Sequence, residues 1–189
     1  MAMIQILAAI ALMSTPDVPP PTGACVWSRL PEAEQQAVVA AYDRSMSQAM
    51  RTLAQRSANL LAISQDCTGR SDLPPRWIQA AIASHVIQLG ASARVEGEKG
   101  LSRARLDRAW DEASEAARSC VFNNAAKPFG IEGPACPDQR AGATFLASLG
   151  LSTANRADRV AAEQALIYMN AKAQQMIADQ LISKAPVRP

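Results

Sequence analysis

The sequence has few of the residues that build catalytic and metal sites. It contains one histidine, His85, so a single chain cannot form a multi-histidine metal site. The glycine-rich loops that bind dinucleotides and nucleotide phosphates are missing, and so are the Gly-x-Ser-x-Gly and His-Glu-x-x-His motifs. No Cys-x-x-Cys pair occurs, which argues against zinc. We therefore expect no metal and no cofactor, and no motif identifies a protein family.

Aromatic residues and net charge are also scarce. Aromatics make up 4% of the 189 residues, and 19 Lys and Arg face 17 Asp and Glu, a net charge of +2. This charge is too small for the electrostatic binding of nucleic acid. Hydrophobic residues reach 49%, and much of that share is alanine, which favours helices and is poor in strands. The composition indicates a globular helical protein without a nucleic-acid partner.

Proline is missing from three long segments, 32–73, 76–127 and 138–185. A proline inside a helix costs about 3 kcal/mol, so helices can run through these segments. No segment keeps the period-two alternation of a strand. Apolar spacing and capping residues predict helices over 31–43, 45–66, 75–96, 102–126, 138–149 and 155–184. The predicted inward face of the last helix carries Val160, Ile167, Gln174, Ile177 and Leu181. The fold class is an all-α, single-domain bundle of five to six helices.

An uncharged apolar run opens the chain at 4–13 and is followed by clustered prolines. The run is too short to span a membrane, which needs about 20 residues, and it has the length of a signal-peptide core. No Lys or Arg precedes it, which departs from the usual pattern. We expect a signal peptide over about 1–14, a Pro-rich spacer over 15–24 and a helical domain over 25–185. The expected location is the bacterial periplasm or the medium, with no stable membrane span after processing.

The tetrapeptide SMSQ at 45–48 has the form of a helix capping box, a serine followed three residues later by glutamine. It predicts a helix break near Ser45. An unbroken helix from 31 to 65 would be about 50 Å long. It would hold Cys25 and Cys67 too far apart to bond, because a disulfide needs Cα atoms within about 7 Å. A hairpin at Ser45 returns Cys67 to Cys25.

The four cysteines allow three pairings. The hairpin favours Cys25–Cys67, and Cys120–Cys136 closes a short loop after a helix, so we predict these two disulfides. They would form in an oxidising compartment. The alternative is four reduced thiols in a cytosolic protein. The triplet 23–25, Gly-Ala-Cys, resembles the end of a lipoprotein signal, but Thr22 stands where an aliphatic residue is expected.

His85 and three carboxylates are the candidates for catalysis. His85 lies about 15 residues from the turn after helix 75–96, opposite Asp111, Glu112 and Glu115 on the next helix. A histidine oriented by a carboxylate can act as a general base. The acids could also form a glycosidase-like pair. The plainer interpretation is a core histidine and a solvated acidic face, and it is the one we favour.

The loop 123–137 is the candidate recognition surface. It is flanked by Phe122, contains Phe129 and Ile131, and is closed by a predicted disulfide. Trp27, Trp77 and Trp110 are expected as core or interface anchors.

The sequence favours an exported, non-enzymatic domain that contacts a protein partner or an envelope component. Two alternatives stay open. One is a small envelope hydrolase that uses His85 with a carboxylate of helix 102–126, and the other is a cytosolic helical adaptor whose apolar N-terminal run packs inside.

Overall fold

The computed structural model describes residues 21–136 and 140–186. Within these ranges the chain forms nine α-helices, one short 3-10 turn and no strand, which confirms the all-α fold class. The expected signal peptide, and the spacer as far as residue 20, lie outside the described residues. Among the helices that the structure describes, none combines the length and the apolar character that a membrane span requires.

The helices differ in length, and several of them are shorter than the sequence predicts. Their bounds are α1 Thr22–Ser28, α2 Glu32–Arg44, α3 Met46–Ala54, α4 Ser57–Thr68, α5 Pro75–Lys99, α6 Arg103–Asp111, α7 Glu115–Ala126, α8 Ala141–Ser148 and α9 Arg159–Lys184, with the 3-10 turn at Lys127–Phe129.

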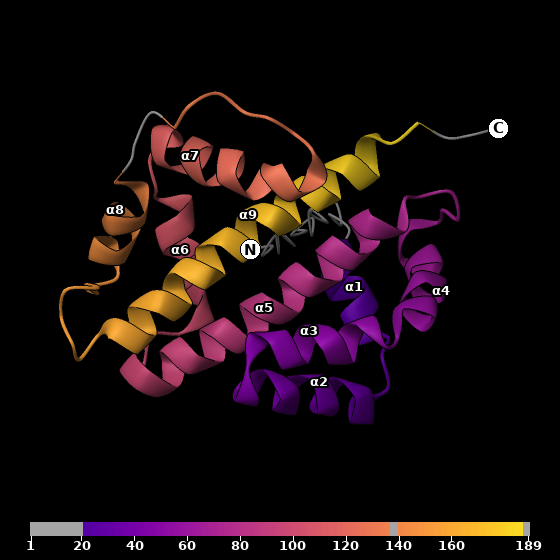
Figure 1. The fold of residues 1–189 in the computed structure, drawn as a ribbon, viewed down its shortest axis with the longest axis horizontal. Helices are drawn as coiled ribbons and strands as arrows, with labels where there is room; N and C mark the ends of the chain where they lie inside the picture. Colours follow the sequence, from indigo (N-terminus) through magenta and orange to yellow (C-terminus); the bar gives the residue numbers. More distant parts are fainter. Residues whose placement is uncertain (1–20, 137–139, 187–189) are drawn as a thin grey trace, which may run out of the picture.

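The two longest helices, α5 and α9, form the centre of the molecule and run antiparallel to each other (Figure 1). Lys99 at the end of α5 forms an ion pair with Asp158 at the start of α9, with 2.6 Å between Nζ and Oδ1. Alanines such as Ala81, Ala165 and Ala178 are fully buried. Such small side chains allow two helix backbones to approach closely. Helices α1–α4 lie to one side of the pair and α6–α8 to the other (Figure 1).

The buried apolar residues form two clusters, and α9 contributes to both. Tyr168 and Met169 belong to the cluster shared with α6, α7 and α8. Ala178 and Ile182 belong to the cluster shared with α1 to α4. The bundle therefore consists of two small cores joined by the α5–α9 pair.

The predicted hairpin break occurs at Ser45, which has an extended backbone and lies between α2 and α3. Its Oγ accepts a hydrogen bond from the Gln48 backbone N–H at 3.1 Å. The structure adds two breaks that the sequence analysis did not predict. One separates α3 from α4 at 55–56, and the other divides the expected helix 102–126 at 112–114. At the second break Ser114 caps α7 by accepting from the Ala117 N–H at 3.2 Å.

The first described helix, α1, starts at Thr22, so it includes the last residues of the expected spacer. Two contacts hold this start. The Thr22 backbone N–H donates to Asp179 Oδ1 of α9 at 3.0 Å. Gly23 packs so closely on α5 that a Cβ there would lie 2.1 Å from the Ala81 carbonyl oxygen. The first helix is thus fixed against both central helices.

The predicted inward face of the last helix is partly wrong. Val160 is 50% exposed, whereas Ala161, Gln164 and Gln175 are buried. Much of the buried face of α9 consists of alanine and glutamine. The prediction used large apolar side chains to locate the buried face of α9, and it therefore located that face incorrectly.

Both disulfides are the ones that the sequence predicts. Cys25 bonds to Cys67 and joins α1 to α4, and Cys120 bonds to Cys136 and joins α7 to the loop after it. Because its sulfur is bonded to Cys67, Cys25 has no free thiol to carry a lipid.

Candidate functional site

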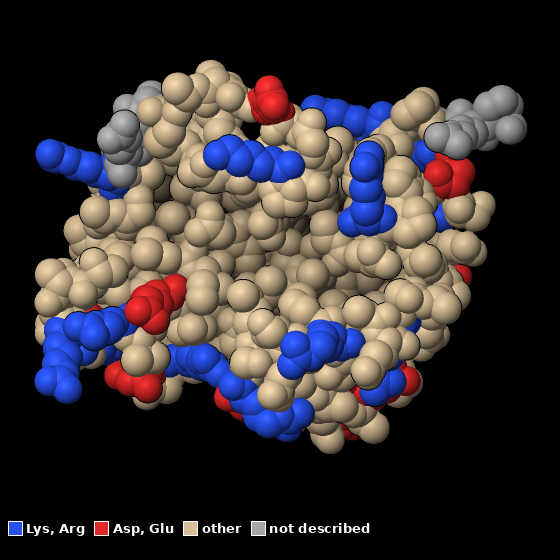
Figure 2. Space-filling view, in the orientation of Figure 1, with Lys and Arg blue, Asp and Glu red and all other residues tan. Residues whose placement is uncertain are grey.

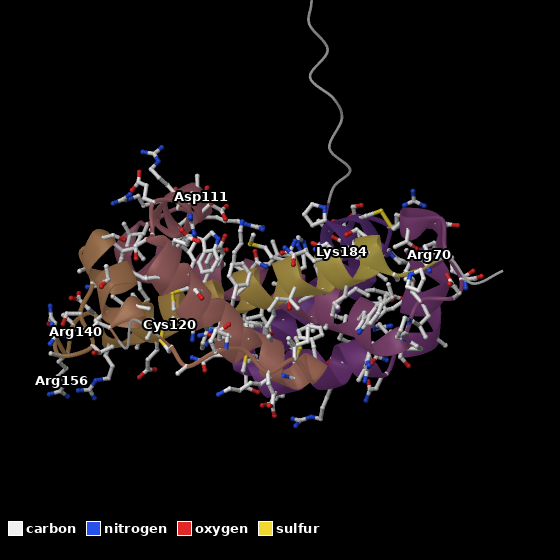
Figure 3. The ribbon with its side chains drawn as sticks, turned by 90° about the horizontal axis from the view of Figure 1, so that it is seen from above. Arg70, Asp111, Cys120, Arg140, Arg156 and Lys184 are labelled. Carbon is white, nitrogen blue, oxygen red and sulfur yellow. A yellow bond between two sulfur atoms is a disulfide. The ribbon has the colours of Figure 1, made fainter. Side chains whose placement is uncertain are left out.

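The structure does not bring His85 together with the three candidate carboxylates. His85 is buried in the middle of α5, and its Nδ1 has no hydrogen-bond partner among the described residues. Asp111 and Glu112 are exposed at the end of α6, and Glu115 is exposed in the first turn of α7. Asp111 lies far from the Lys184 end of the molecule, on an outer edge (Figure 3). The chain break at 112–114 removes the long helix that was expected to place these acids opposite His85.

The surroundings of His85 favour its neutral form. Burial, followed by the positive charge of Arg103, lowers its pKa from 6.5 to about 4. Its ring lies 6.3 Å from that of Trp27, centroid to centroid. His85 therefore behaves as a core residue, which is the plainer of the two interpretations made from the sequence.

We expect the free energy of unfolding to fall by about 3 kcal/mol through His85 alone as the pH drops from 6.5 to 4. In that window the unfolded chain binds a proton at His85 and the folded chain does not, so acid favours unfolding. Urea unfolding at a series of pH values measures how steeply the free energy of unfolding changes with pH. His85→Gln cannot titrate, and its curve should be flatter than that of the wild type. Parallel curves would show that His85 is not buried in its neutral form.

A polar cluster joins α6 to α9. Asp107 Oδ1 accepts from Tyr168 Oη at 2.7 Å and from Lys172 Nζ at 2.5 Å. Burial alone would raise the pKa of the Asp107 carboxyl, but these hydrogen bonds outweigh it and the pKa is lowered. Burial and the Asp107 contact raise the pKa of Tyr168. These hydrogen bonds connect α6 to α9 and explain why Asp107 and Tyr168 lie where they do.

Metal binding has no support in the geometry of the described ranges. They contain no group of three or more His, Cys, Asp or Glu side chains close enough to hold an ion.

A cavity of about 490 Å³ opens between α7, the C-terminal half of α9 and the start of α5. It is open to solvent on one side, and we call it the groove. From α9 it is lined by Ile177, Leu181 and Lys184, and from α5 by Trp77. Two smaller cavities, of about 220 and 120 Å³, lie against the start of α5 and its neighbours α3 and α4. The groove is thus the candidate functional site.

One wall of the groove is the loop that the sequence analysis selected as a recognition surface. Ile131 lines the groove from this loop, with Phe122 and Ala126 of α7 beside it. The Cys120–Cys136 disulfide ties the far end of the loop to α7. Asn123 Nδ2 adds a hydrogen bond to the Pro134 carbonyl oxygen at 2.9 Å. This wall is therefore a loop with a fixed shape.

The opposite wall is the short segment after α9, where Ala185 and Pro186 line the groove. Arg70 holds this segment, because Nη1 donates to the Ala185 carbonyl at 2.6 Å and Nη2 to the Pro186 carbonyl at 2.8 Å. Asp72 fixes the guanidinium group of Arg70 through two hydrogen bonds, at 2.9 and 2.7 Å. Figure 3 shows Arg70 and Lys184 toward the same end of the molecule.

The two disulfides support opposite walls. Cys67 lies three residues before Arg70, and its bond to Cys25 fixes the end of α4 from which Arg70 extends. Cys120–Cys136 fixes the loop on the other side. Each crosslink thus lies close in sequence to residues that form or hold one wall of the groove.

Trp77 and Trp110 act as anchors around the groove. Trp77 lines it directly. Trp110 is 2% exposed, and its ring meets that of Phe122 edge to face, with 5.5 Å between the centroids. Phe122 is thus held from behind and presents a rigid apolar surface.

Lys184 is the one charged residue in the groove lining. It is exposed, and it takes part in none of the ion pairs found between described residues. On the face that carries α7 and the C-terminal half of α9, the middle is formed by uncharged residues, and both basic and acidic residues border it (Figure 2). The lining of the groove itself is mostly apolar, with Lys184 as its charged residue.

The sequence points to the loop and to Trp77 but not to Arg70, Lys184 or the segment 185–186. No motif marks these residues, because they meet at the groove only when α4 and α9 have packed. Comparison with known proteins adds no assignment: no family model, curated protein or solved structure matches this chain.

Proposed function

We propose that this protein is an exported, non-enzymatic binding domain that contacts a component of the bacterial envelope through the groove. The observation that carries the proposal is the groove itself, an apolar cavity of about 490 Å³ with walls fixed by two disulfides. Concave apolar sites with few polar groups are typical of ligand binding. The groove brings no pair of titratable groups together for catalysis.

Export is supported by the apolar start of the sequence and by the disulfides. The chain has four cysteines and all of them are paired, which is usual in the periplasm and rare in the cytosol. This arrangement favours export over the cytosolic adaptor. The mass of the intact protein, purified untagged from a periplasmic extract, should show loss of about the first 14 residues and two disulfides. A cytosolic protein with its leader and free thiols would contradict the proposal.

The binding role is tested by replacing Ile131 with aspartate. Ile131 is 40% exposed at the groove, so a charge there should leave the fold intact but disrupt apolar binding. We expect the fraction of protein that sediments with washed envelopes to fall severalfold. The measurement is a quantitative blot of pellet and supernatant.

Val39 provides a matched control for this experiment. It is 43% exposed on α2, away from the groove, so Val39→Asp makes the same chemical change at similar exposure. Val39→Asp should sediment like the wild type. If both variants sediment equally, or if the wild type does not sediment at all, the groove is not an envelope-binding site.

A further inference from the structure

The shape of the groove limits what can occupy it. Its volume of about 490 Å³ is in the range of sites for small molecules, which is roughly 300–1,000 Å³. A stable protein interface needs about 800 Å² from each partner. The large exposed apolar residues are scattered over different elements: Val39 on α2, Met46 on α3, Ile131 in the loop, and Val160 and Met176 on α9. Of these residues, Ile131 lines the groove and Met176 precedes the lining residue Ile177, whereas Val39, Met46 and Val160 are not in the lining. The volume of the groove therefore favours a small molecule as its occupant.

The lining combines two kinds of surface. Trp77, Phe122, Ile131, Ile177 and Leu181 form the apolar part. Lys184 adds a positive charge, and no Asp or Glu is in the lining. Such a site can bury a hydrocarbon chain while a charged group remains near water.

Two further cations lie next in sequence to lining residues. Arg76 precedes Trp77, and Lys127 follows Ala126. Both are exposed, and neither takes part in an ion pair found between described residues. Two acids are adjacent in the same way, Glu132 to Ile131 and Asp179 to Gln180, and Asp179 Oδ1 accepts a hydrogen bond from the Thr22 N–H. These neighbours include as many acids as cations, so the preference for a negative head group depends on Lys184, the charged residue of the lining itself.

We propose that the groove binds a single-chain anionic amphiphile, with its hydrocarbon chain on the apolar lining and its head group at Lys184. This inference rests on the proposed function and names the class of envelope component. A carboxylate and a phosphate head group share the required chemistry, so both are tested.

The mature, oxidised protein is titrated with amphiphiles that share a twelve-carbon chain, each below its micelle concentration. The probes are dodecanoate, dodecyl phosphate, dodecyl maltoside and dodecyltrimethylammonium. Binding is followed by calorimetry and by tryptophan fluorescence, to which Trp77 contributes from within the groove. We expect saturable binding with one ligand per protein and an affinity at least tenfold higher for an anionic than for the cationic probe. The tighter of the two anions identifies the head group.

Reversing the charge of Lys184 separates the head-group contact from the apolar contact. Lys184→Glu should weaken binding of the anions about fivefold and change binding of dodecyl maltoside less than twofold. Arg51→Glu is the matched control, because Arg51 is exposed on α3 and its reversal changes the net charge equally. It should leave all affinities unchanged. Leu181→Asp should abolish binding of every probe, with circular dichroism reporting that the fold is retained.

Failure of this inference can be distinguished from failure of the proposed function. If Ile131→Asp reduces envelope sedimentation but no amphiphile binds, the groove is a binding site and the ligand class is wrong. If an apolar peptide binds saturably and the amphiphiles do not, the groove is again a binding site and the ligand class is again wrong. Equal binding of all head groups, unaffected by Lys184→Glu, would also overturn the inference. If sedimentation and amphiphile binding are both insensitive to groove substitutions, both proposals are wrong.

Discussion

Replacing Cys25 and Cys67 together with serine should lower the free energy of unfolding by about 4 kcal/mol. The bond closes a loop with a sequence separation of 42 and removes many conformations from the unfolded chain. In the folded chain it joins α1 to the end of α4, and Arg70 then connects this end to the segment after α9. The loss is therefore large compared with the 5–15 kcal/mol that is typical of a domain. Denaturant unfolding of the oxidised proteins measures it.

The second disulfide provides the comparison. Its sequence separation is 16, so the Cys120→Ser, Cys136→Ser double variant should lose about 3 kcal/mol, less than the first variant. The two variants should also affect different walls of the groove. A larger loss for Cys120–Cys136, or no loss for Cys25–Cys67, would show that loop length does not determine their contributions.

Replacing Gly90 with alanine should destabilise the protein by about 3 kcal/mol. Gly90 lies on α5 against the ring of Tyr42, and an added Cβ would lie 2.3–2.5 Å from three ring carbons. The ring cannot easily move. It is 2% exposed, the guanidinium carbon of Arg94 lies 5.2 Å from its centroid, and its hydroxyl contacts Gln164 at 3.3 Å. The added methyl group must therefore displace α2 from α5.

Gly97 provides the control on the same helix. A Cβ there meets nothing within 4 Å, so Gly97→Ala should stabilise the protein by about 0.5–1 kcal/mol through helix propensity alone. Thermal and urea unfolding of the two variants should show opposite signs. A Gly90→Ala protein as stable as the wild type would mean that Tyr42 and Gly90 do not pack as described.

The features that the sequence predicted well depend on local chemistry or on geometric necessity. The break at Ser45 follows from a side chain that caps the next helix, and the pairing of Cys25 with Cys67 follows from that break. The ends of α4 and α5 have a similarly local cause, although they lie two to three residues beyond the predicted ends: Gly69 and Gly100 have the left-handed backbone that ends each helix. Signals of this kind are contained in a few neighbouring residues.

The features that the sequence missed depend on packing between distant segments. The break at Ser114 competes with an apolar stripe that continues past it, from Trp110 to Ala117, and the stripe suggested one helix. On α9 every alanine is buried, but alanine is too small and too common in helices to mark a buried face in the sequence. The predicted pairing of His85 with the acids of the expected helix 102–126 is not formed, because the prediction assumed that this helix is unbroken.

The groove was predictable in part. The loop with Ile131 carried a local signal, since a predicted disulfide and exposed apolar residues coincide there. The wall formed by 185–186 had no local signal in the sequence, because Arg70 reaches carbonyl groups more than 100 residues away along the chain. Backbone carbonyls are present at every position, so the sequence does not reveal which of them a side chain will bind.

The position of α9 in the chain has a consequence for the order of assembly during synthesis. The helix that completes both cores, α9, is the last of the described helices to be synthesised. Until then α5 exposes its central face, including Gln88, whose amide bonds to Gln175 of α9. Contacts between segments so far apart in sequence form late. Until α9 is made neither core is complete, and an incompletely folded polypeptide is one that can be threaded through a translocation channel.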